Sequence, residues 1–269
     1  MFGAYRADVS HRDDLHVVDA PAEPGAPLVV IVHGAMDRAS SFGRVARGLR
    51  DIHLIRYDRR GYGRSAAAGP ALLDAHVADL ETVLAGRRAV VFGHSMGAIV
   101  ALVAAARHPD LVRAVLAFEP PTPWEDWWPG PKHDPDADPA SEAEAFMVRA
   151  VGDRLWRRLP ARTRDDRRAE GGALQADLAS LRAGRPFVPG DVHAPVVMAY
   201  GSDTTWWHER GALDLAAVLP DTDVEVIEGA SHGAHLTHPT AVVELVRRTL
   251  AWADLAESAG PRGPGPSRR

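Results

Sequence analysis

Short apolar runs that alternate with helix-like segments restrict the fold of this 269-residue sequence more than any other feature. Runs at 28–32, 52–57 and 89–92 are partly β-branched, and each is followed by a turn that contains glycine. Such runs are typical of strands buried on both faces of a parallel sheet. The segments 72–84 and 97–107 between and after them have helical spacing, and this alternation predicts the α/β class. Later strands are expected at 113–118, 195–200 and 224–228, and later helices at 212–219 and 240–253. We therefore expect a mostly parallel central sheet of at least six parallel strands, flanked by helices.

Residues 120–191 interrupt this rhythm. The segment begins with a stretch rich in Pro and Trp, continues with helical spacing over 141–159, and contains no comparable strand. A segment of this length is too long for a plain loop in a compact domain. We predict a helical cap at 120–191, inserted between two parts of one core at 1–119 and 192–256, with a disordered tail at 257–269 that is rich in Gly, Pro, Ser and Arg.

Composition excludes several classes of protein. The chain is 46% hydrophobic and 25% charged, which allows a full buried core, and it has no cysteine for a disulfide, a thiol nucleophile or a cysteine metal site. Its longest apolar stretch, 96–106, is shorter than the ~18 residues that cross a bilayer, and no secretion signal is evident at the N-terminus. The net charge of −5 and the lack of a dense basic stripe argue against nucleic acid. We expect a cytoplasmic monomer or homodimer without a nucleic-acid or membrane partner.

The sharpest chemical signal is G-H-S-M-G at 93–97, which directly follows the strand at 89–92 and directly precedes a helix. This context makes a G-x-S-x-G motif meaningful, because the serine then lies on a tight turn at the carboxyl edge of a sheet. The turn requires small residues on both sides of the serine, here Gly93 and Gly97. We predict that Ser95 is a nucleophile.

A serine hydroxyl needs a neighbouring base. We assign this role to His232, which follows the last expected strand among small residues. With His235 and His238 it has a spacing that could suggest a metal site, but no carboxylate motif accompanies it and Pro239 breaks the regularity, so we predict no metal and no cofactor. The oxyanion donors are expected to be the backbone amides of Met96 and of Ala35, the latter after His33-Gly34 at the end of the first strand.

Four motifs in order resemble the α/β-hydrolase family over roughly residues 15–255. They are His33-Gly34, D-R-R-G-Y-G-R-S at 58–65, G-H-S-M-G at 93–97, and the late histidine His232. The resemblance implies the α/β-hydrolase fold and serine-hydrolase chemistry, but it does not specify the substrate.

The acid that orients His232 has several candidates. In most of the family it is an Asp three residues beyond the glycine that ends the strand at 195–200, but Thr204 occupies that position and Asp203 lies one residue early. A branch that includes zearalenone-type lactonases is similar to this chain in placing Glu, with Pro shortly after, where Glu119-Pro120 follows the strand at 113–118. The resemblance implies Glu119 as the acid. Asp203 remains an alternative, as do Glu125 and Asp126, because relatives of haloalkane dehalogenases take an acid from that region.

Tryptophans suggest the nature of the substrate. Six of the seven lie in the insertion or in the loop after Tyr200, and we expect Gly34, Trp128, Trp206 and Trp207 to contact substrate. An aromatic pocket near an acidic stretch favours a small hydrophobic ester or lactone. A tryptophan patch for dimerisation is the competing interpretation. The predicted function is a serine hydrolase of the carboxylesterase or lactonase kind, with a carbon–carbon bond hydrolase, a cofactor-free lyase or a non-catalytic receptor as alternatives.

Overall fold

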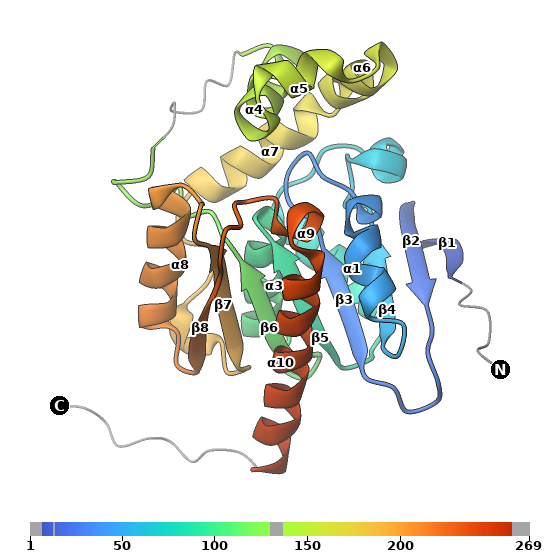
Figure 1. Cartoon of the computed structure of the whole chain (residues 1–269), viewed down its shortest axis with the longest axis vertical. Coiled ribbons are helices and arrows are strands. Elements are labelled where there is room, and N and C mark those ends of the chain that lie inside the picture. The colour runs from blue at the N-terminus through green and yellow to red at the C-terminus, as the bar shows by residue number, and fades with distance from the viewer. Residues whose placement is uncertain (1–6, 13, 130–136, 260–269) are drawn as a thin grey trace.

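An eight-stranded sheet forms the centre of the molecule, as a computed structural model of residues 7–12, 14–129 and 137–259 describes it (Figure 1). The strand order is β1-β2-β4-β3-β5-β6-β7-β8. The strands are β1 (Asp8–Arg12), β2 (Leu15–Ala20), β3 (Leu28–Val32), β4 (His53–Tyr57), β5 (Ala89–His94), β6 (Val112–Phe118), β7 (Val196–Gly201) and β8 (Thr222–Ile227). The sheet from β4 to β8 is entirely parallel, which confirms the six predicted strands.

The first two strands were not expected from the sequence. β1 and β2 form an antiparallel hairpin that extends the sheet beyond β4. β1 is largely exposed and polar and so lacks the apolar run that marks a buried strand. The edge position of β1 explains this composition, because an edge strand does not need two apolar faces.

Helices cover both faces of the sheet. On one face, α2 (Leu73–Leu84), α3 (Met96–Arg107) and α8 (Trp206–Val218) pack on one apolar cluster, and on the other face α1 (Gly43–Gly48) and α10 (Pro239–Ser258) pack on a second. Successive side chains of β3 point to opposite faces of the sheet, so Val30 and Val32 belong to one cluster and Val29 and Ile31 to the other. Short helices complete the core: η1 (Ala39–Phe42), η2 (Gly63–Ala68), η3 (Pro189–Asp191) and α9 (Ala234–Thr237). In the part of the chain that the structure describes, no helix is both long and apolar enough to span a bilayer.

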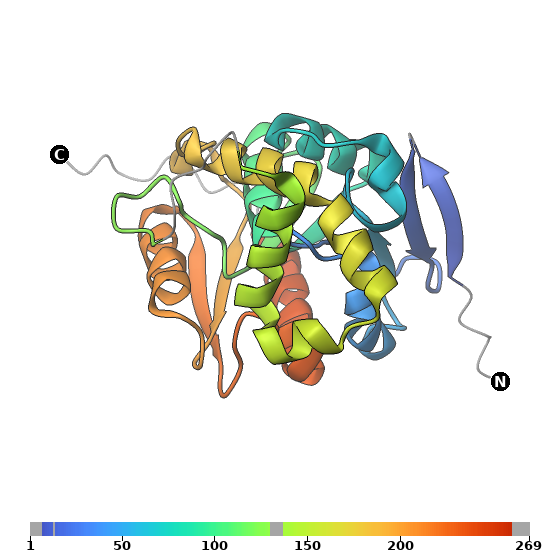
Figure 2. The same ribbon diagram turned by 90° about the horizontal axis from the view of Figure 1, so that it is seen from above.

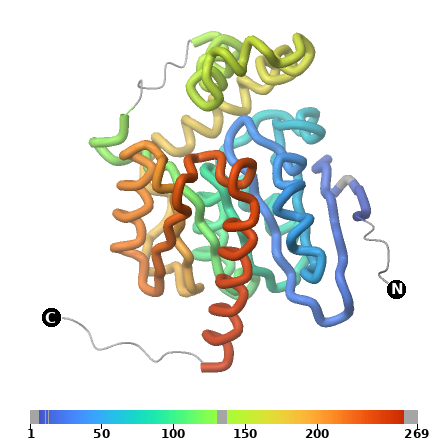
Figure 3. Tube along the Cα trace, in the orientation of Figure 1, coloured from blue at the N-terminus to red at the C-terminus, as the bar shows by residue number. Residues whose placement is uncertain are grey.

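Four helices between β6 and β7 form a separate layer over one edge of the sheet, here called the helical layer (Figures 2 and 3). They are α4 (Pro139–Val151), α5 (Asp153–Arg158), α6 (Ala161–Ala169) and α7 (Gly171–Arg182). The helical stretch expected at 141–159 is divided at Gly152, whose φ of 83° ends α4 and precedes α5. The layer has its own small apolar cluster, in which Trp156 and Leu174 pack with Met36 and Tyr62 of the core.

The predicted cap and tail both extend beyond the described residues. Residues 130–136 of the expected cap and 260–269 of the expected tail lie outside the described residues. Glu257 and Ser258, assigned to a disordered tail from the sequence, instead form the end of α10. A contact distant in sequence explains the difference: the Glu257 carboxylate binds the Arg113 guanidinium on β6, with Oε2 2.8 Å from Nη2. This contact fixes the last helical turn against the sheet.

Candidate active site

Ser95 lies on a strained turn between β5 and α3. Its φ of 54° and ψ of −123° are unusual for a residue other than glycine, and its N–H donates to the Phe118 carbonyl on β6 at 2.8 Å. A Cβ at Gly93 would collide with the Gly97 carbonyl oxygen, and one at Gly97 would collide with the Val32 carbonyl oxygen. The turn therefore needs small residues at both positions, as the motif predicts. The turn places Ser95 at the carboxyl edge of the parallel strands.

The loop after β3 passes directly beside Ser95. A Cβ at Gly34 would lie only 2.9 Å from the Ser95 Cβ, so glycine is required for this approach. Met96 begins α3, which places its backbone amide at a helix N-terminus, and Met36 in the loop has a φ of 56°. Positive φ also occurs at Glu119, so three such non-glycine residues gather at this edge of the sheet. The assignment of the Ala35 and Met96 amides as oxyanion donors remains a prediction.

His33 holds this loop in place. Its Nε2 accepts the Arg59 backbone N–H at 2.8 Å, which leaves the hydrogen on Nδ1 to donate to the Gly34 carbonyl at 2.7 Å. Burial, with the neighbouring Arg59 charge, lowers the pKa of His33 to about 4. The ring is thus neutral at physiological pH, and both of its nitrogens serve to fix the backbone before Ala35.

The structure brings Glu119 and His232 together. Glu119 follows β6 and is fully buried, and its Oε2 lies 2.6 Å from His232 Nδ1 while its Oε1 accepts the Gly201 N–H at 3.0 Å. An ionised carboxylate oxygen can only accept a hydrogen bond. The contact therefore places the hydrogen on His232 Nδ1 and leaves its Nε2 free to act as a base. Among the described residues no hydrogen bond joins Ser95 and His232, although the His94 ring that precedes Ser95 lies 4.7 Å from the His232 ring. Catalytic hydrogen bonds are often long until substrate binds.

The other carboxylates considered from the sequence lie elsewhere. Asp203 is exposed and its carboxylate is 3.4 Å from the Ser202 hydroxyl. Glu125 accepts from the Trp124 indole at 2.9 Å and pairs with Arg185 at 3.0 Å, and Asp126 is exposed. Of these candidates, Glu119 is the one with a recorded contact to His232.

His208 is a site residue that the sequence analysis missed. Its ring stacks on His232 with centroids 4.3 Å apart and planes 8° apart, and its Nδ1 lies 3.6 Å from Glu119 Oε2 and 3.0 Å from the Thr205 hydroxyl. Burial and then the neighbouring His232 lower the pKa of His208 to about 2, so it stays neutral. Its position in the first turn of α8, just beyond a strand end, was the available signal.

Tryptophan rings surround His208. Trp128 meets it edge-on at 5.6 Å and Trp207 lies 6.0 Å away, while Trp206 packs edge-on against Trp207 and is half exposed. Trp127 contacts both Trp128 and Trp206 at about 6 Å. The three tryptophans predicted to contact substrate thus form one aromatic cluster that reaches the His208–His232 stack. Their contact with substrate remains a prediction.

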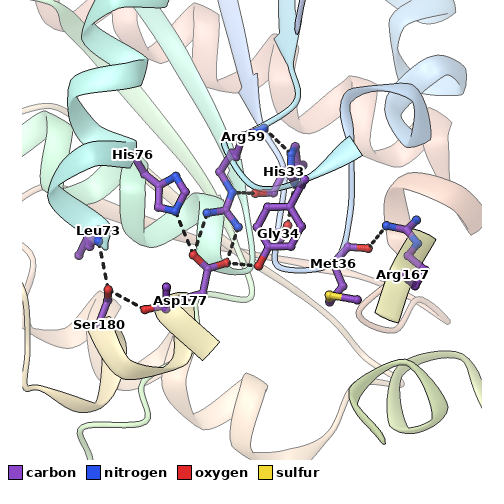
Figure 4. Close-up of polar contacts among 11 residues, drawn as sticks. His33, Gly34, Met36, Arg59, Leu73, His76, Arg167, Asp177 and Ser180 are labelled. Atoms are coloured by element: carbon purple, nitrogen blue, oxygen red, sulfur yellow. Dashed lines mark hydrogen bonds and ion pairs between the residues drawn. The ribbon is translucent and has the colours of Figure 1, made fainter. Parts of the chain in front are cut away.

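Polar contacts tie the helical layer to the loop beside Ser95 (Figure 4). Arg59 is fully buried and forms a two-point ion pair with Asp177 on α7, at 2.7 and 3.1 Å, while its Nε donates to the His33 carbonyl at 3.0 Å. Arg167 on α6 donates to the Met36 carbonyl at 2.6 Å. The layer therefore contacts one end of the loop that contains Ala35 directly, through Arg167, and is linked to the other end through Arg59.

A family model described as the alpha/beta hydrolase family matches residues 29–245, which include the strained serine, the Glu119–His232 pair and the loop after β3. The chain belongs to the alpha/beta hydrolase family. This confirms the family and the fold expected from the four motifs.

Several relatives of this alpha/beta hydrolase are similar over most of its length. It is 29% identical over 242 residues to a pimeloyl-[acyl-carrier protein] methyl ester esterase from Chromobacterium violaceum, covering 83% of this chain and 94% of that protein. It is 28% identical over 269 residues to a 2-(acetamidomethylene)succinate hydrolase from Mesorhizobium japonicum, covering 88% and 94%. Identity to lipase LipV from Mycobacterium tuberculosis is 36%, but that match spans 40% of this chain and only 42% of the lipase.

A solved structure supports the same architecture. The enol-lactonase from Burkholderia xenovorans LB400 superimposes with a TM-score of 0.68 at 21% identity, covering 91% of this chain and all of the lactonase. At this identity the similarity is one of fold. Family membership rests on the family model, which spans residues 29–245.

Proposed function

We propose that this alpha/beta hydrolase cleaves a hydrophobic carboxylic ester or lactone through an acyl-enzyme on Ser95. The 2.6 Å contact between buried Glu119 and His232 Nδ1 is the observation that carries this proposal, because it sets the imidazole tautomer that a serine nucleophile needs. The strained turn at Ser95 and the close approach of Gly34 support it. The nucleophile also argues against the chemistry of family members that attack with Asp.

The first half-reaction forms the acyl-enzyme. Ser95 Oγ attacks the substrate carbonyl carbon while His232 Nε2 takes the hydroxyl proton. The negative charge that develops on the carbonyl oxygen is stabilised by the amides of Ala35 and Met96, each worth roughly 3 kcal/mol in comparable sites. His232 then gives its proton to the leaving alkoxide oxygen as the carbon–oxygen bond breaks.

The second half-reaction regenerates the enzyme. His232 removes a proton from water, whose oxygen attacks the acyl carbon, and returns the proton to Ser95 Oγ as the acid product leaves. In both steps Glu119 stays ionised and stabilises the imidazolium. With a lactone, the alkoxide and acyl group belong to one molecule, so the product is a single hydroxy acid.

The aromatic cluster supports the hydrophobic substrate class. Trp128 and Trp207 lie around His208, which stacks on His232, so apolar rings approach the atoms proposed to react. The helical layer above this edge supplies a lid in the proposed site. Such surroundings favour uncharged acyl and alcohol groups over phosphorylated ones.

Active-site labelling tests the proposal. A fluorophosphonate probe should label the wild-type protein once, Ser95→Ala should not be labelled, and the wild type should release an acid and an alcohol from p-nitrophenyl esters. A panel of esters and lactones of increasing chain length then identifies the preferred class. Retained ester hydrolysis in folded Ser95→Ala, or labelling at another residue, would overturn the acyl-enzyme. Tight retention of a ligand without turnover would favour a receptor.

A further inference from the structure

A second cluster of histidine and carboxylate groups lies at the end of β5 and includes His94. Asp37 follows the loop beside Ser95, His94 ends β5, and His235 belongs to α9. One ligand-capable atom from each lies within 4.8 Å of the others. His94 and His235 are about 5% exposed, and the Asp37 side chain is 19% exposed.

The converging atoms have no hydrogen-bond partners among the described residues. This holds for Asp37 Oδ2, His94 Nδ1 and His235 Nε2, all of which are buried. Buried polar atoms in folded proteins almost always have a partner, so three in one place need an explanation. Asp37 Oδ2 and His235 Nε2 lie 3.3 Å apart, within ion-pair distance, but their geometry is not that of an ordinary hydrogen bond.

His94 has the tautomer of a metal ligand. Its Nε2 lies 2.8 Å from the His232 carbonyl oxygen, and because a carbonyl only accepts, Nε2 carries the hydrogen and Nδ1 presents a bare lone pair. Histidines that bind metals commonly donate their other N–H to a backbone carbonyl in this way.

The spacing also fits a metal ion. Tetrahedral zinc with bonds of about 2.0–2.1 Å holds its ligand atoms about 3.3 Å apart, which is the Asp37–His235 separation. The third ligand atom, His94 Nδ1, lies within 4.8 Å of the other two.

The cluster of Glu119, His208 and His232 also has ligand atoms within 4.8 Å of one another. There, however, the nitrogens already have partners, since His232 Nδ1 binds Glu119 and His208 Nδ1 contacts the Thr205 hydroxyl. A metal would have to displace those hydrogen bonds. Among the described residues, the converging atoms of the Asp37 cluster have only the 3.3 Å contact between Asp37 and His235.

We propose that Asp37, His94 and His235 bind a divalent transition-metal ion, with zinc as the best match. Two imidazoles and one carboxylate suit zinc, cobalt or nickel, whereas magnesium and calcium prefer sites built from oxygen ligands. The ion would join the loop that contains Ala35, the turn before Ser95 and the helix after His232. This proposal departs from the metal-free expectation, because the sequence did not show that His235 would meet a carboxylate from residue 37.

Metal titration of the full chain, freed of any affinity tag and of bound metal, tests the site. Zinc binding is measured by calorimetry, and cobalt binding by the visible absorption of a tetrahedral cobalt complex. Asp37→Asn and His235→Phe keep side-chain volume, and the phenyl ring retains the stacking on Phe42 that His235 has at 4.4 Å. Glu119→Gln and His208→Phe are matched controls that alter the neighbouring cluster. Circular dichroism verifies that each variant is folded.

The wild type and both controls should bind one ion, and Asp37→Asn and His235→Phe should weaken binding by about 100-fold or more. Zinc should raise the melting temperature of the wild type and of the controls, but not of the two ligand variants. Unchanged binding in the ligand variants, or loss of binding in Glu119→Gln instead, would overturn the assignment. Failure of the wild type to bind more tightly than about 1 mM would also overturn it and leave the cluster as a site for water.

Discussion

Two buried carboxylates, Glu119 at the carboxyl edge of the sheet and Asp177 on α7 of the helical layer, differ in what neutralises them. Glu119 contacts two imidazoles, His232 at 2.6 Å and His208 at 3.6 Å, and one backbone N–H. Asp177 contacts the permanent cation Arg59 at two points, and also His76 at 3.1 Å and the Tyr62 hydroxyl at 2.7 Å. Both carboxylates are almost completely buried.

This difference predicts a catalytic role for the charge of Glu119 and a structural role for the charge of Asp177. Arg59 already compensates Asp177; although burial opposes its charge, Asp177 raises the pKa of Arg59, and the pair stays ionised. Glu119 has no arginine or lysine among its recorded contacts, so its charge is available to an imidazolium when His232 takes a proton. We therefore expect changes at Glu119 to affect turnover and changes at Asp177 to affect stability.

Glu119→Gln should have the largest effect. The amide keeps the shape of the side chain but removes the charge and favours the wrong tautomer of His232, so kcat for a p-nitrophenyl ester should fall by about 10³- to 10⁴-fold. Asp203→Asn is the matched control and should retain kcat within about twofold, since Asp203 is exposed. The reverse result, with the loss confined to Asp203→Asn, would reassign the acid and break the comparison.

The contrast also shows what could be predicted from the sequence. Ser95 and Glu119 follow apolar strands, and the carboxyl ends of neighbouring parallel strands meet at one edge, so strand prediction alone places them together. The strand register then pairs His94 of β5 with Phe118 of β6, and these residues directly precede Ser95 and Glu119. The family resemblance favoured Glu119 over Asp203, and Glu119 is the one of the two that lies 2.6 Å from His232.

The partners of Asp177 could not be predicted in this way. Asp177 and Arg59 are separated by 118 residues and lie in different layers, and no strand register relates them. His208 was missed for a similar reason, because its stacking on His232 depends on how α8 packs against the sheet. The hairpin of β1 and β2 escaped prediction because polar edge strands carry no apolar run. Local sequence patterns do not encode the contacts that depend on how one layer packs against another.

Asp177→Ala should give the second-largest effect. Removal of the carboxylate leaves Arg59 buried without its counterion, which costs about 3–5 kcal/mol of unfolding free energy, measurable by urea denaturation. The double variant Arg59→Met/Asp177→Leu should recover part of this loss, because it leaves no uncompensated charge. A loss below about 1 kcal/mol in Asp177→Ala would show that the ion pair is not the structural charge described above.

Acidification should weaken the region beneath the helical layer through His76. Burial, followed by the Arg59 charge, lowers the pKa of His76 although Asp177 opposes this, so the folded state keeps the ring neutral. The unfolded chain takes up the proton below its usual pKa of about 6.5, so stability is complete above that pH and falls as pH decreases. The contribution of His76 is at most about 1.4 kcal/mol per pH unit, and Asp177, whose pKa is depressed, adds its own loss only below about pH 4.

Urea denaturation between pH 7.5 and 5.5 measures this slope. His76→Gln should lower stability overall but give a shallower dependence on pH than the wild type, because the variant has one fewer group that protonates on unfolding. An identical slope in the two proteins would place the titrating histidines elsewhere in the molecule.

His208 should give the smallest effect, and it tests whether Glu119 serves one imidazole or two. If His208 acts by stacking, His208→Phe should retain kcat and the pH profile, because the phenyl ring can occupy the same plane 4.3 Å from His232. His208→Ala should lower kcat by about threefold to tenfold with little change in KM, in line with the 0.5–1.5 kcal/mol of an aromatic pair. An equal loss in both variants would instead mean that the His208 nitrogen 3.6 Å from Glu119 contributes. Glu119 would then serve both imidazoles, and its charge would be shared in the way that Asp177 is shared between Arg59 and His76.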